Sequence, residues 1–171
     1  MAMNPRTFLS FAAVVILLCL SSCGYTLVTE KGIIGGEVVA VDVPVFKNRT
    51  YEAQIPFFFT DAFSRELAGS GLFDINRKDA DSTLQGTVVA LRSTPSALSG
   101  QGLAVQKTVE ITIELVLSKK TGAQVKRWTL TDSEAYAVDT INLEEFNRKE
   151  ALRRIAARMA RRFSSLAFNE G

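Results

Sequence analysis

The chain contains no histidine, and only two cysteines and one tryptophan occur among its 171 residues. Without histidine, the Ser-His and Cys-His catalytic arrangements are excluded, and a zinc site is strongly disfavoured. A large excess of either charge is also missing, since 20 Lys and Arg stand against 18 Asp and Glu. This balance excludes a strongly basic nucleic-acid-binding protein and an acidic disordered chain. With no glycine-rich loop in the order that phosphate binding requires, we expect no enzymatic activity, no cofactor and no metal.

The chain also lacks an apolar run long enough to span a bilayer, which takes about 20 apolar residues. Its apolar run over 8–20 follows Arg6 and fits the core of a secretory signal. The run leads directly into the tetrad 20–23 (LSSC), which resembles the bacterial lipobox. We therefore expect residues 1–22 to be a lipoprotein signal peptide that is removed, and Cys23 to be lipidated. The alternative is an ordinary secretory signal that a chance cysteine follows.

Cleavage after residue 22 settles the fate of both cysteines. Cys19 is lost with the signal and Cys23 carries lipid, so the mature chain has no free thiol and no disulfide. Acyl chains on Cys23 make an effectively permanent membrane anchor, because each buried methylene contributes about 0.8 kcal/mol. Gly24 rather than aspartate follows the cysteine, which by analogy with lipoprotein sorting in Gram-negative bacteria indicates the outer membrane. We expect a lipidated segment over 23–36 and a single domain over 37–168.

The hydrophobic pattern of the mature chain predicts a small α+β domain. The predicted elements are a strand over 37–46, a helix over 54–68, a short strand over 72–76, strands over 84–92, 105–117 and 124–136, and a helix over 142–166. In the first strand, Val39, Val41, Val43 and Val45 are expected to share one face. Two helices covering one face of the sheet would leave the polar side of the 105–117 strand to water or to a partner.

Two segments between these elements carry polar patterns. Residues 47–50 (KNRT) predict a polar turn, and residues 93–101 predict a mobile loop because they are uncharged and rich in small residues. This loop could lie against a partner or simply connect two strands. Asp132 and Glu134 are two apart on a predicted strand and share a face; without a pocket, such a pair is usually surface charge.

The last predicted helix has a start signal and a basic face. Asn142 with Glu145 matches a capping box, and Ile141 with Phe146 is spaced as a hydrophobic staple. The helix carries an apolar stripe opposite its arginines, formed by Leu152, Ile155, Met159, Phe163 and Leu166. Residues 142–166 contain seven Lys and Arg but only three Glu.

Three segments resemble the LptE/RlpB-type family of lipopolysaccharide-assembly outer-membrane lipoproteins. They are the start 23–27 (CGYTL), the stretch 43–52 (VPVFKNRTYE) before the first helix, and 71–75 (GLFDI) after it. The resemblance implies a two-layer α+β sandwich, with two helices packed on one face of a mainly antiparallel four-stranded sheet; a mixed sheet is the alternative.

The same resemblance implies a function. Such lipoproteins plug the LptD-type outer-membrane β-barrel that exports lipopolysaccharide, help to assemble it, and in some cases bind lipopolysaccharide. The expected location is the outer membrane, with the chain lipid-anchored, facing the periplasm and lying within the barrel lumen. The alternative is an auxiliary periplasmic lipoprotein of another lipid-transport complex.

No lipopolysaccharide-binding residue transfers by motif, so the candidates come from the basic helix. Guanidinium groups suit phosphate, and lipid A and the inner core of lipopolysaccharide carry phosphates. The candidate contacts are Arg153, Arg154, Arg158 and Arg161, and charge reversal at Arg154 and Arg158 is expected to weaken lipopolysaccharide binding. The alternative is a solvated helix face with cations near the helix C-terminus.

Overall fold

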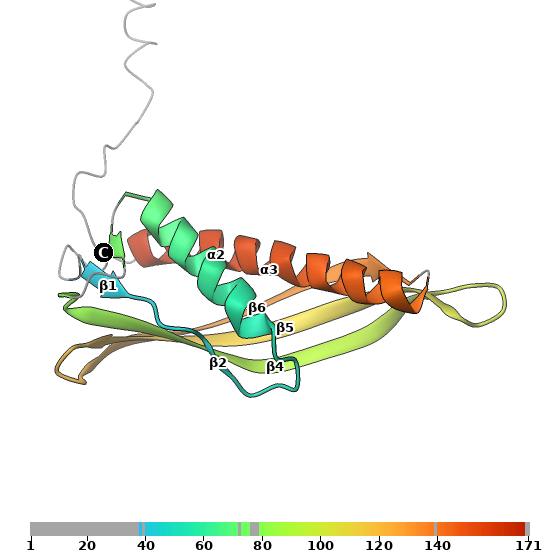
Figure 1. Cartoon of the computed structure of the whole chain (residues 1–171), viewed down its shortest axis with the longest axis horizontal. Coiled ribbons are helices and arrows are strands. Elements are labelled where there is room, and N and C mark those ends of the chain that lie inside the picture. The colour runs from blue at the N-terminus through green and yellow to red at the C-terminus, as the bar shows by residue number, and fades with distance from the viewer. Residues whose placement is uncertain (1–37, 39, 72, 76–78, 139, 170–171) are drawn as a thin grey trace, which may run out of the picture.

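Figure 1 shows a computed structural model of the whole chain, of which residues 38, 40–71, 73–75, 79–138 and 140–169 are described. The expected signal peptide over 1–22, Cys23 and the expected lipidated segment over 23–36 therefore lie outside the described residues.

Three long strands form most of the sheet: β4 (Ser82–Leu98), β5 (Ala104–Lys119) and β6 (Gln124–Ala137). They pair antiparallel as two successive hairpins. β5 has one buried face and one face that is less buried. Every second residue from Val109 to Leu117 is buried under the helices, and the residues between them are less buried. This alternation is typical of an antiparallel sheet that is covered on one side. The β5–β6 turn includes Gly122 at φ 88°, a positive backbone angle that glycine adopts readily in a hairpin turn.

The rest of the sheet is parallel and consists of short strands, β1 (Ala40–Asp42), β2 (Lys47–Asn48) and β3 (Asp74–Ile75). The sheet has six strands in the order β3-β1-β4-β5-β6, with β2 also paired to β4. The fold class is therefore α+β as predicted, but the four-stranded antiparallel sheet was wrong and the mixed alternative is correct. The parallel pairing was hard to predict because strands of two or three residues carry too little periodicity to show which strand they join.

Proline splits the predicted strand over 37–46. Pro44 has no N–H to donate, and the chain leaves β1 before it and rejoins the sheet at β2. Of the four valines predicted to share one face, Val41 and Val43 are both buried, but Val45 is 54% exposed, so the shared face does not extend to it. Val39 lies outside the described residues. The expected polar turn over 47–50 is also partly wrong, because its first two residues form β2; the turn follows, with Asn48 Oδ1 accepting a hydrogen bond from Thr50 N at 2.9 Å.

The predicted mobile loop over 93–101 is mostly strand. β4 continues to Leu98, and its residues Ser93, Thr94 and Pro95 pair with β5, with register shifts beyond Pro95. The small, uncharged residues suggested a loop because composition does not show strand pairing. β5 is long enough to pair with these residues of β4, and this pairing outweighs their weak strand propensity. Only 99–103 forms the connection, where Gly102 has φ 77°.

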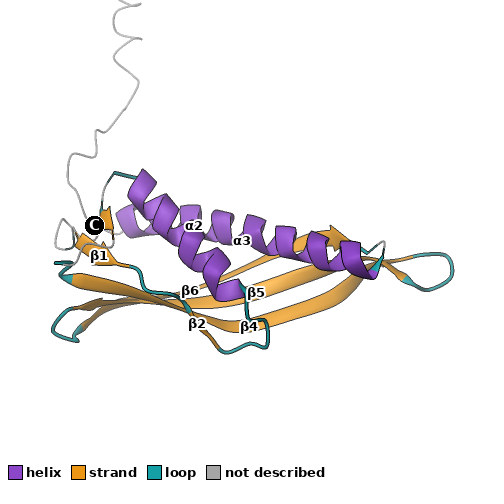
Figure 2. Cartoon of the chain, viewed as in Figure 1, coloured by secondary structure: helices purple, strands orange, loops and turns teal. Residues whose placement is uncertain are grey.

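Two helices, α2 (Ile55–Gly69) and α3 (Ile141–Asn169), cover one face of the sheet. Figure 2 shows α3 running along the sheet and α2 crossing beside it. α2 agrees with the helix predicted over 54–68 to within one residue at each end, and Pro56 lies in its first turn, where its missing N–H has no helical partner to lose. The core lies between the layers and includes Phe59, Phe63, Leu84, Ile111, Ile113, Leu115, Leu152, Ile155, Met159 and Phe163.

The start of α3 differs from its prediction. The helix begins at Ile141, and Thr140 caps it, since Thr140 Oγ1 accepts a hydrogen bond from Leu143 N at 3.4 Å. Glu145 instead pairs with Lys149 at 2.7 Å, and Phe146 is 58% exposed. The predicted capping box and hydrophobic staple were therefore wrong, because Thr140 is a capping residue two positions earlier.

Candidate functional site: the arginine face of the last helix

The buried stripe of α3 determines where its arginines lie. Leu152, Ile155, Met159 and Phe163 are buried against the sheet and α2, and Leu166 is partly buried. The helix therefore presents arginines along both edges of the stripe, one edge beside β6 and the other beside α2. Residues four apart lie on the same edge, which sets Arg154 and Arg158 together.

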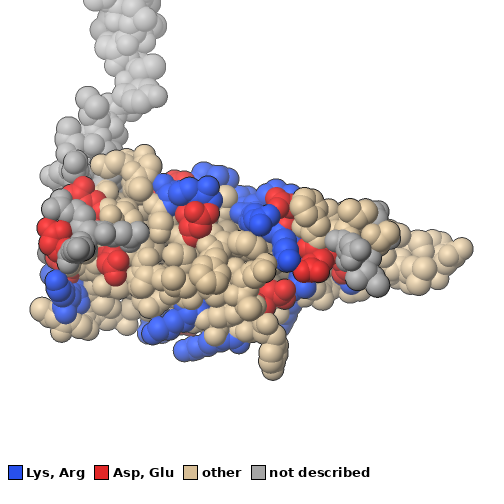
Figure 3. Space-filling view, viewed as in Figure 1, with Lys and Arg blue, Asp and Glu red and all other residues tan. Residues whose placement is uncertain are grey.

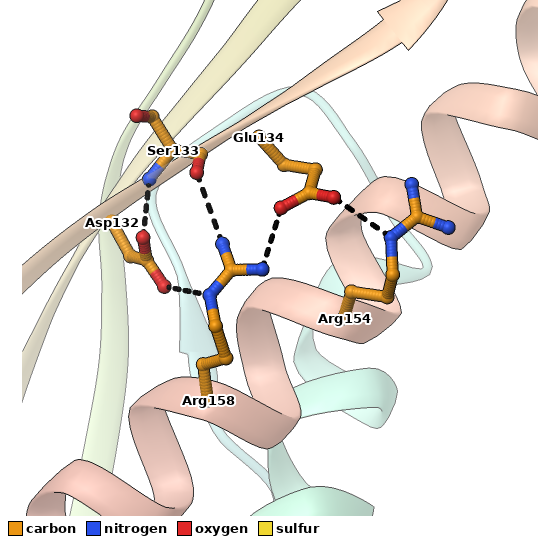
Figure 4. A network of polar contacts seen from close by, with 5 residues as sticks. All are labelled: Asp132, Ser133, Glu134, Arg154 and Arg158. Carbon is orange, nitrogen blue, oxygen red and sulfur yellow. Dashed lines mark hydrogen bonds and ion pairs between the residues drawn. The ribbon is translucent and has the colours of Figure 1, made fainter.

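On the β6 edge, Arg158 and Arg154 form a network of ion pairs with two carboxylates (Figure 4). Arg158 Nε donates to Asp132 Oδ2 at 3.0 Å, and Arg158 Nη1 donates to Glu134 Oε2 at 2.5 Å. Arg158 Nη2 also donates to the carbonyl oxygen of Ser133 at 3.0 Å. Arg154 Nε donates to Glu134 Oε1 at 2.9 Å. Five polar groups thus join α3 to β6.

The network shifts the ionisation of its members. Partial burial opposes the ionised form of Glu134, yet hydrogen bonds from Arg158 and Arg154 prevail and lower its pKa. The hydrogen bond from Arg158 to Asp132 raises the pKa of Arg158 against partial burial. Both groups are therefore held in their charged forms, as an ion-pair network requires.

On the α2 edge, Arg153 and Arg161 line a groove of about 390 Å³ between the two helices. The Arg153 guanidinium lies 4.8 Å from the centre of the Phe58 ring and pairs with Glu150. Arg161 makes no hydrogen bond or ion pair within the described part of the chain. Acids are present as well, since the groove is lined by Phe58, Asp61, Ala62, Arg65, Glu66, Arg153, Ala157 and Arg161.

The four candidate arginines are thus divided into two pairs rather than gathered at one site. Arg154 and Arg158 face internal carboxylates, and Arg153 and Arg161 face the groove. The sequence predicted that Asp132 and Glu134 share one strand face, but not that this face meets α3. The spacing of the acids on a strand and of the arginines on a helix is visible in the sequence, yet nothing local shows that these two elements lie side by side.

Two other features are absent from the described residues, a group of metal ligands and a helix that could span a membrane. Among the residues that the structure describes, no three His, Cys, Asp or Glu side chains are grouped so as to hold a metal ion. No helix in the described ranges is long and apolar enough to cross a bilayer. What remains is a basic face on α3, seen with its neighbouring acids in Figure 3, on a two-layer α+β module.

This fold and this face define the class, a small two-layer module with a helix pair over an open mixed sheet. The LptE family of lipopolysaccharide-assembly proteins matches residues 38–165. The chain belongs to this family, as its sequence motifs indicated. Among curated proteins none matches the chain.

Solved structures share the fold at low sequence identity. A minor lipoprotein from Acinetobacter baumannii is 14% identical, with a TM-score of 0.54 over 80% of this chain and 92% of that one. The rare lipoprotein B from Shewanella oneidensis is 13% identical, with a TM-score of 0.53 over 77% of this chain and 96% of that one. A lipoprotein of Caulobacter crescentus is 16% identical, with a TM-score of 0.50 over 70% and 84%.

Proposed function

We propose that this chain is an outer-membrane lipoprotein that plugs the lipopolysaccharide-exporting β-barrel and helps to assemble it, without catalysing a reaction. The observation that carries the proposal is the match of the LptE family to residues 38–165, downstream of the tetrad 20–23 that resembles a lipobox and ends at Cys23. In this proposal the segment 1–22 is removed, acylated Cys23 anchors the chain, and 23–36 connects the anchor to the domain.

The open face of the sheet supports a role in contacting a partner. It carries cross-strand pairs of polar groups: Thr112 and Thr131 form a hydrogen bond at 2.9 Å, and Arg127 lies 3.9 Å from Glu114. Polar groups that are already paired on a broad sheet suit a wet, polar interface with another protein. The helices cover only the opposite face, so the open face is available to the barrel.

Lipopolysaccharide contact remains part of the proposal, with the four arginines as candidate phosphate ligands. The contacts within the chain favour Arg161 over the other three. Arg153, Arg154 and Arg158 already bind carboxylates, and a phosphate would have to displace Glu150, Glu134 or Asp132. Arg161 has no such competitor among the described residues, and its groove has room for a phosphate group.

Co-purification with the membrane-bound barrel tests this function. The full precursor, tagged at its C-terminus, is extracted from outer membranes in mild detergent, and co-purifying proteins are identified by mass spectrometry. We expect a large β-barrel to be recovered with the native chain, and Cys23→Ser to move the chain from the membrane to the soluble periplasmic fraction. Cys19→Ser is the matched control, since it alters only the signal and leaves the anchor site intact.

Two results would contradict the proposal. Recovery of an inner-membrane transporter in place of the barrel would support the alternative, an auxiliary lipoprotein of another lipid-transport complex. Retention of the Cys23→Ser chain in the membrane fraction would show that Cys23 is not the anchor.

A further inference from the structure

β6 forms one edge of the sheet. It pairs with β5 and with no other strand among the described residues. An edge strand presents a row of backbone N–H and C=O groups that a strand of another chain can pair with. Proteins often bind extended segments in this way, through the main chain of an added strand. The backbone groups along this edge therefore decide whether β6 can bind such a partner.

The register shows which backbone groups of β6 point away from β5. Val138 N, just past the strand, donates to Val105 O of β5 at 3.0 Å. The pairing runs without a shift from Ala137 back to Lys126. Backbone groups in an antiparallel pair alternate between those that face the partner strand and those that face away. The even-numbered residues of β6 therefore bond to β5, and the odd-numbered ones present their N–H and C=O groups at the edge.

Side chains protect the second half of this edge. Ser133 N donates to Asp132 Oδ1 at 2.7 Å, and Ser133 O accepts from Arg158 Nη2 at 3.0 Å (Figure 4). Further along, Ala137 O accepts from Asn147 Nδ2 at 3.1 Å. A strand added to this half would have to displace these contacts.

The first half of the edge, residues 127–131, lacks this protection and is named the open edge. Its outward N–H and C=O groups belong to Arg127, Thr129 and Thr131. Within the described ranges, no strand or side chain bonds to these groups. The open edge thus keeps a row of backbone donors and acceptors for another chain.

The charged side chains at the start of the open edge lie away from it. Lys126 Nζ lies 5.5 Å from the centre of the Trp128 ring, on the helix side of the sheet. Arg127 Nη1 lies 3.9 Å from Glu114 Oε2 of β5, so this side chain leans toward the inner strand. Charged side chains can keep other strands from an edge, but here neither one covers the backbone groups.

The surroundings of the open edge are basic. Arg158 of α3 pairs with Asp132. Arg162 lies one turn further on the same side of α3, where the next helix-facing residue of β6 is Leu130 and not an acid. Arg162 makes no hydrogen bond or ion pair within the part of the chain that the structure describes. Residues 124–131 add two basic side chains and no acidic one, so a strand with acidic side chains complements this edge in charge.

The partner must itself supply a row of free backbone groups. Acyl chains have no such groups, and the strands of a closed barrel wall already pair with one another. An extended loop or tail of the barrel that lies in the lumen has them. The open edge spans about 17 Å at about 3.4 Å per residue, so a short segment suffices.

We propose that the open edge of β6 binds an extended acidic segment of the barrel, which joins the sheet as a further strand. This rests on the proposed function, because the barrel is the partner. Main-chain hydrogen bonds hold the segment, and the basic groups around the edge select its charge. The protected half of the edge ends the pairing at Ser133.

Hydrogen exchange in the purified complex tests the pairing directly. The full lipidated chain is compared alone and bound to the barrel in the same detergent, and deuterium uptake over 127–131 is followed by mass spectrometry. In the free chain, the outward amides of Arg127, Thr129 and Thr131 exchange fast, whereas the amides between them are bonded to β5. We expect the three outward amides to exchange several-fold more slowly in the complex.

A proline variant separates main-chain pairing from side-chain contact. Thr129→Pro removes one outward N–H and leaves the bonds to β5, a change that a sheet edge tolerates. Ala135→Pro makes the same change beyond Ser133 and is the matched control. We expect Thr129→Pro to lower recovery of the barrel several-fold and Ala135→Pro to retain it, with urea unfolding used to show that both variants fold.

The charge of the segment has its own test. We expect Arg162→Glu to lower recovery of the barrel several-fold at low salt, whereas Arg162→Lys, which keeps the positive charge, should retain it. Equal recovery with the two variants would overturn the acidic character of the segment.

The remaining outcomes distinguish this inference from the proposed function. Unchanged exchange over 127–131 in the complex, or full recovery of the barrel with Thr129→Pro, overturns the strand addition alone. If Thr129→Pro does not fold, the exchange of the native chain decides. Protection that appears in the free chain as its concentration rises would identify a second copy as the partner and also overturn the inference. If no barrel is recovered with the native chain, the proposed function itself fails.

Discussion

At the scale of single residues, the tightest packing is between Gly86 of β4 and Phe46, which lies in the segment before α2. A Cβ atom added at Gly86 would lie 2.2 Å from Cε2 of Phe46, whose ring is buried and packs 5.2 Å from the ring of Phe63. Glycine is therefore needed at position 86 for close approach and not for a special backbone angle.

We expect Gly86→Ala to lower the free energy of unfolding by about 1–3 kcal/mol, because the Phe46 ring must shift within a packed core. The measurement is urea unfolding followed by circular dichroism. Gly100→Ala is the matched control, since a Cβ there meets nothing within 4 Å. Equal stability of the two variants would show that Phe46 has room to move.

The ion-pair network gives a second residue-scale prediction, on pH. Because the pKa of Glu134 is lower in the folded chain than in the unfolded one, its ion pairs stabilise the fold above the unfolded value of about 4.3, and this stabilisation is lost as pH falls through the folded pKa. We expect the stability difference between the native chain and Glu134→Gln to be full near neutral pH and to shrink below about pH 4. Urea unfolding across this range measures it, and a difference that is independent of pH would contradict the assignment.

At the scale of elements, the aromatic contacts between the layers do most to fix α2 and α3 on the sheet. The ring of Phe163 on α3 lies 5.6 Å from that of Phe63 on α2 and packs edge-on against Trp128 of β6 at 5.1 Å. One side chain thus joins both helices and the sheet. The ion pairs at Arg158 are more exposed, and such pairs contribute about 1 kcal/mol or less each.

We expect Phe163→Ala to destabilise the fold by about 3–5 kcal/mol through the lost contacts and the cavity that remains. Phe146→Ala on the same helix is the control, and it should leave the urea midpoint nearly unchanged because Phe146 is exposed. Similar urea midpoints for the two variants would contradict a dominant role of Phe163 in the packing between the layers, because alanine favours the helix more than phenylalanine at both positions.

At the scale of the whole molecule, the domain has three distinct surfaces. The helix layer carries the arginines, the opposite sheet face is open, and the end of the β4–β5 hairpin is apolar and uncharged over 93–106. If lipopolysaccharide phosphates contact the helix layer, the contact must use arginines that the fold leaves unpaired.

Charge reversal distinguishes a phosphate site from general basicity. We expect Arg161→Glu to weaken lipopolysaccharide binding several-fold, whereas Arg162→Glu, its equally exposed neighbour outside the groove, should have a smaller effect. Binding is measured with the full lipidated chain and fluorescent lipopolysaccharide at low and physiological salt, since surface attraction is screened by salt. Equal effects of the two reversals would favour the solvated-face interpretation over a site.

The sequence by itself determined the α+β class, both helices, the three long strands and the family, because these rest on long periodic patterns and on motifs that are local in the chain. The tertiary structure decided the mixed six-stranded sheet, the extension of β4 to Leu98 and the division of the arginines into two pairs. Each of these depends on which segments meet in space. Strand pairing and ion pairing between distant residues leave no periodicity that a single chain reveals, so Asp132, Glu134 and Arg158 could be seen in the sequence but not matched to one another.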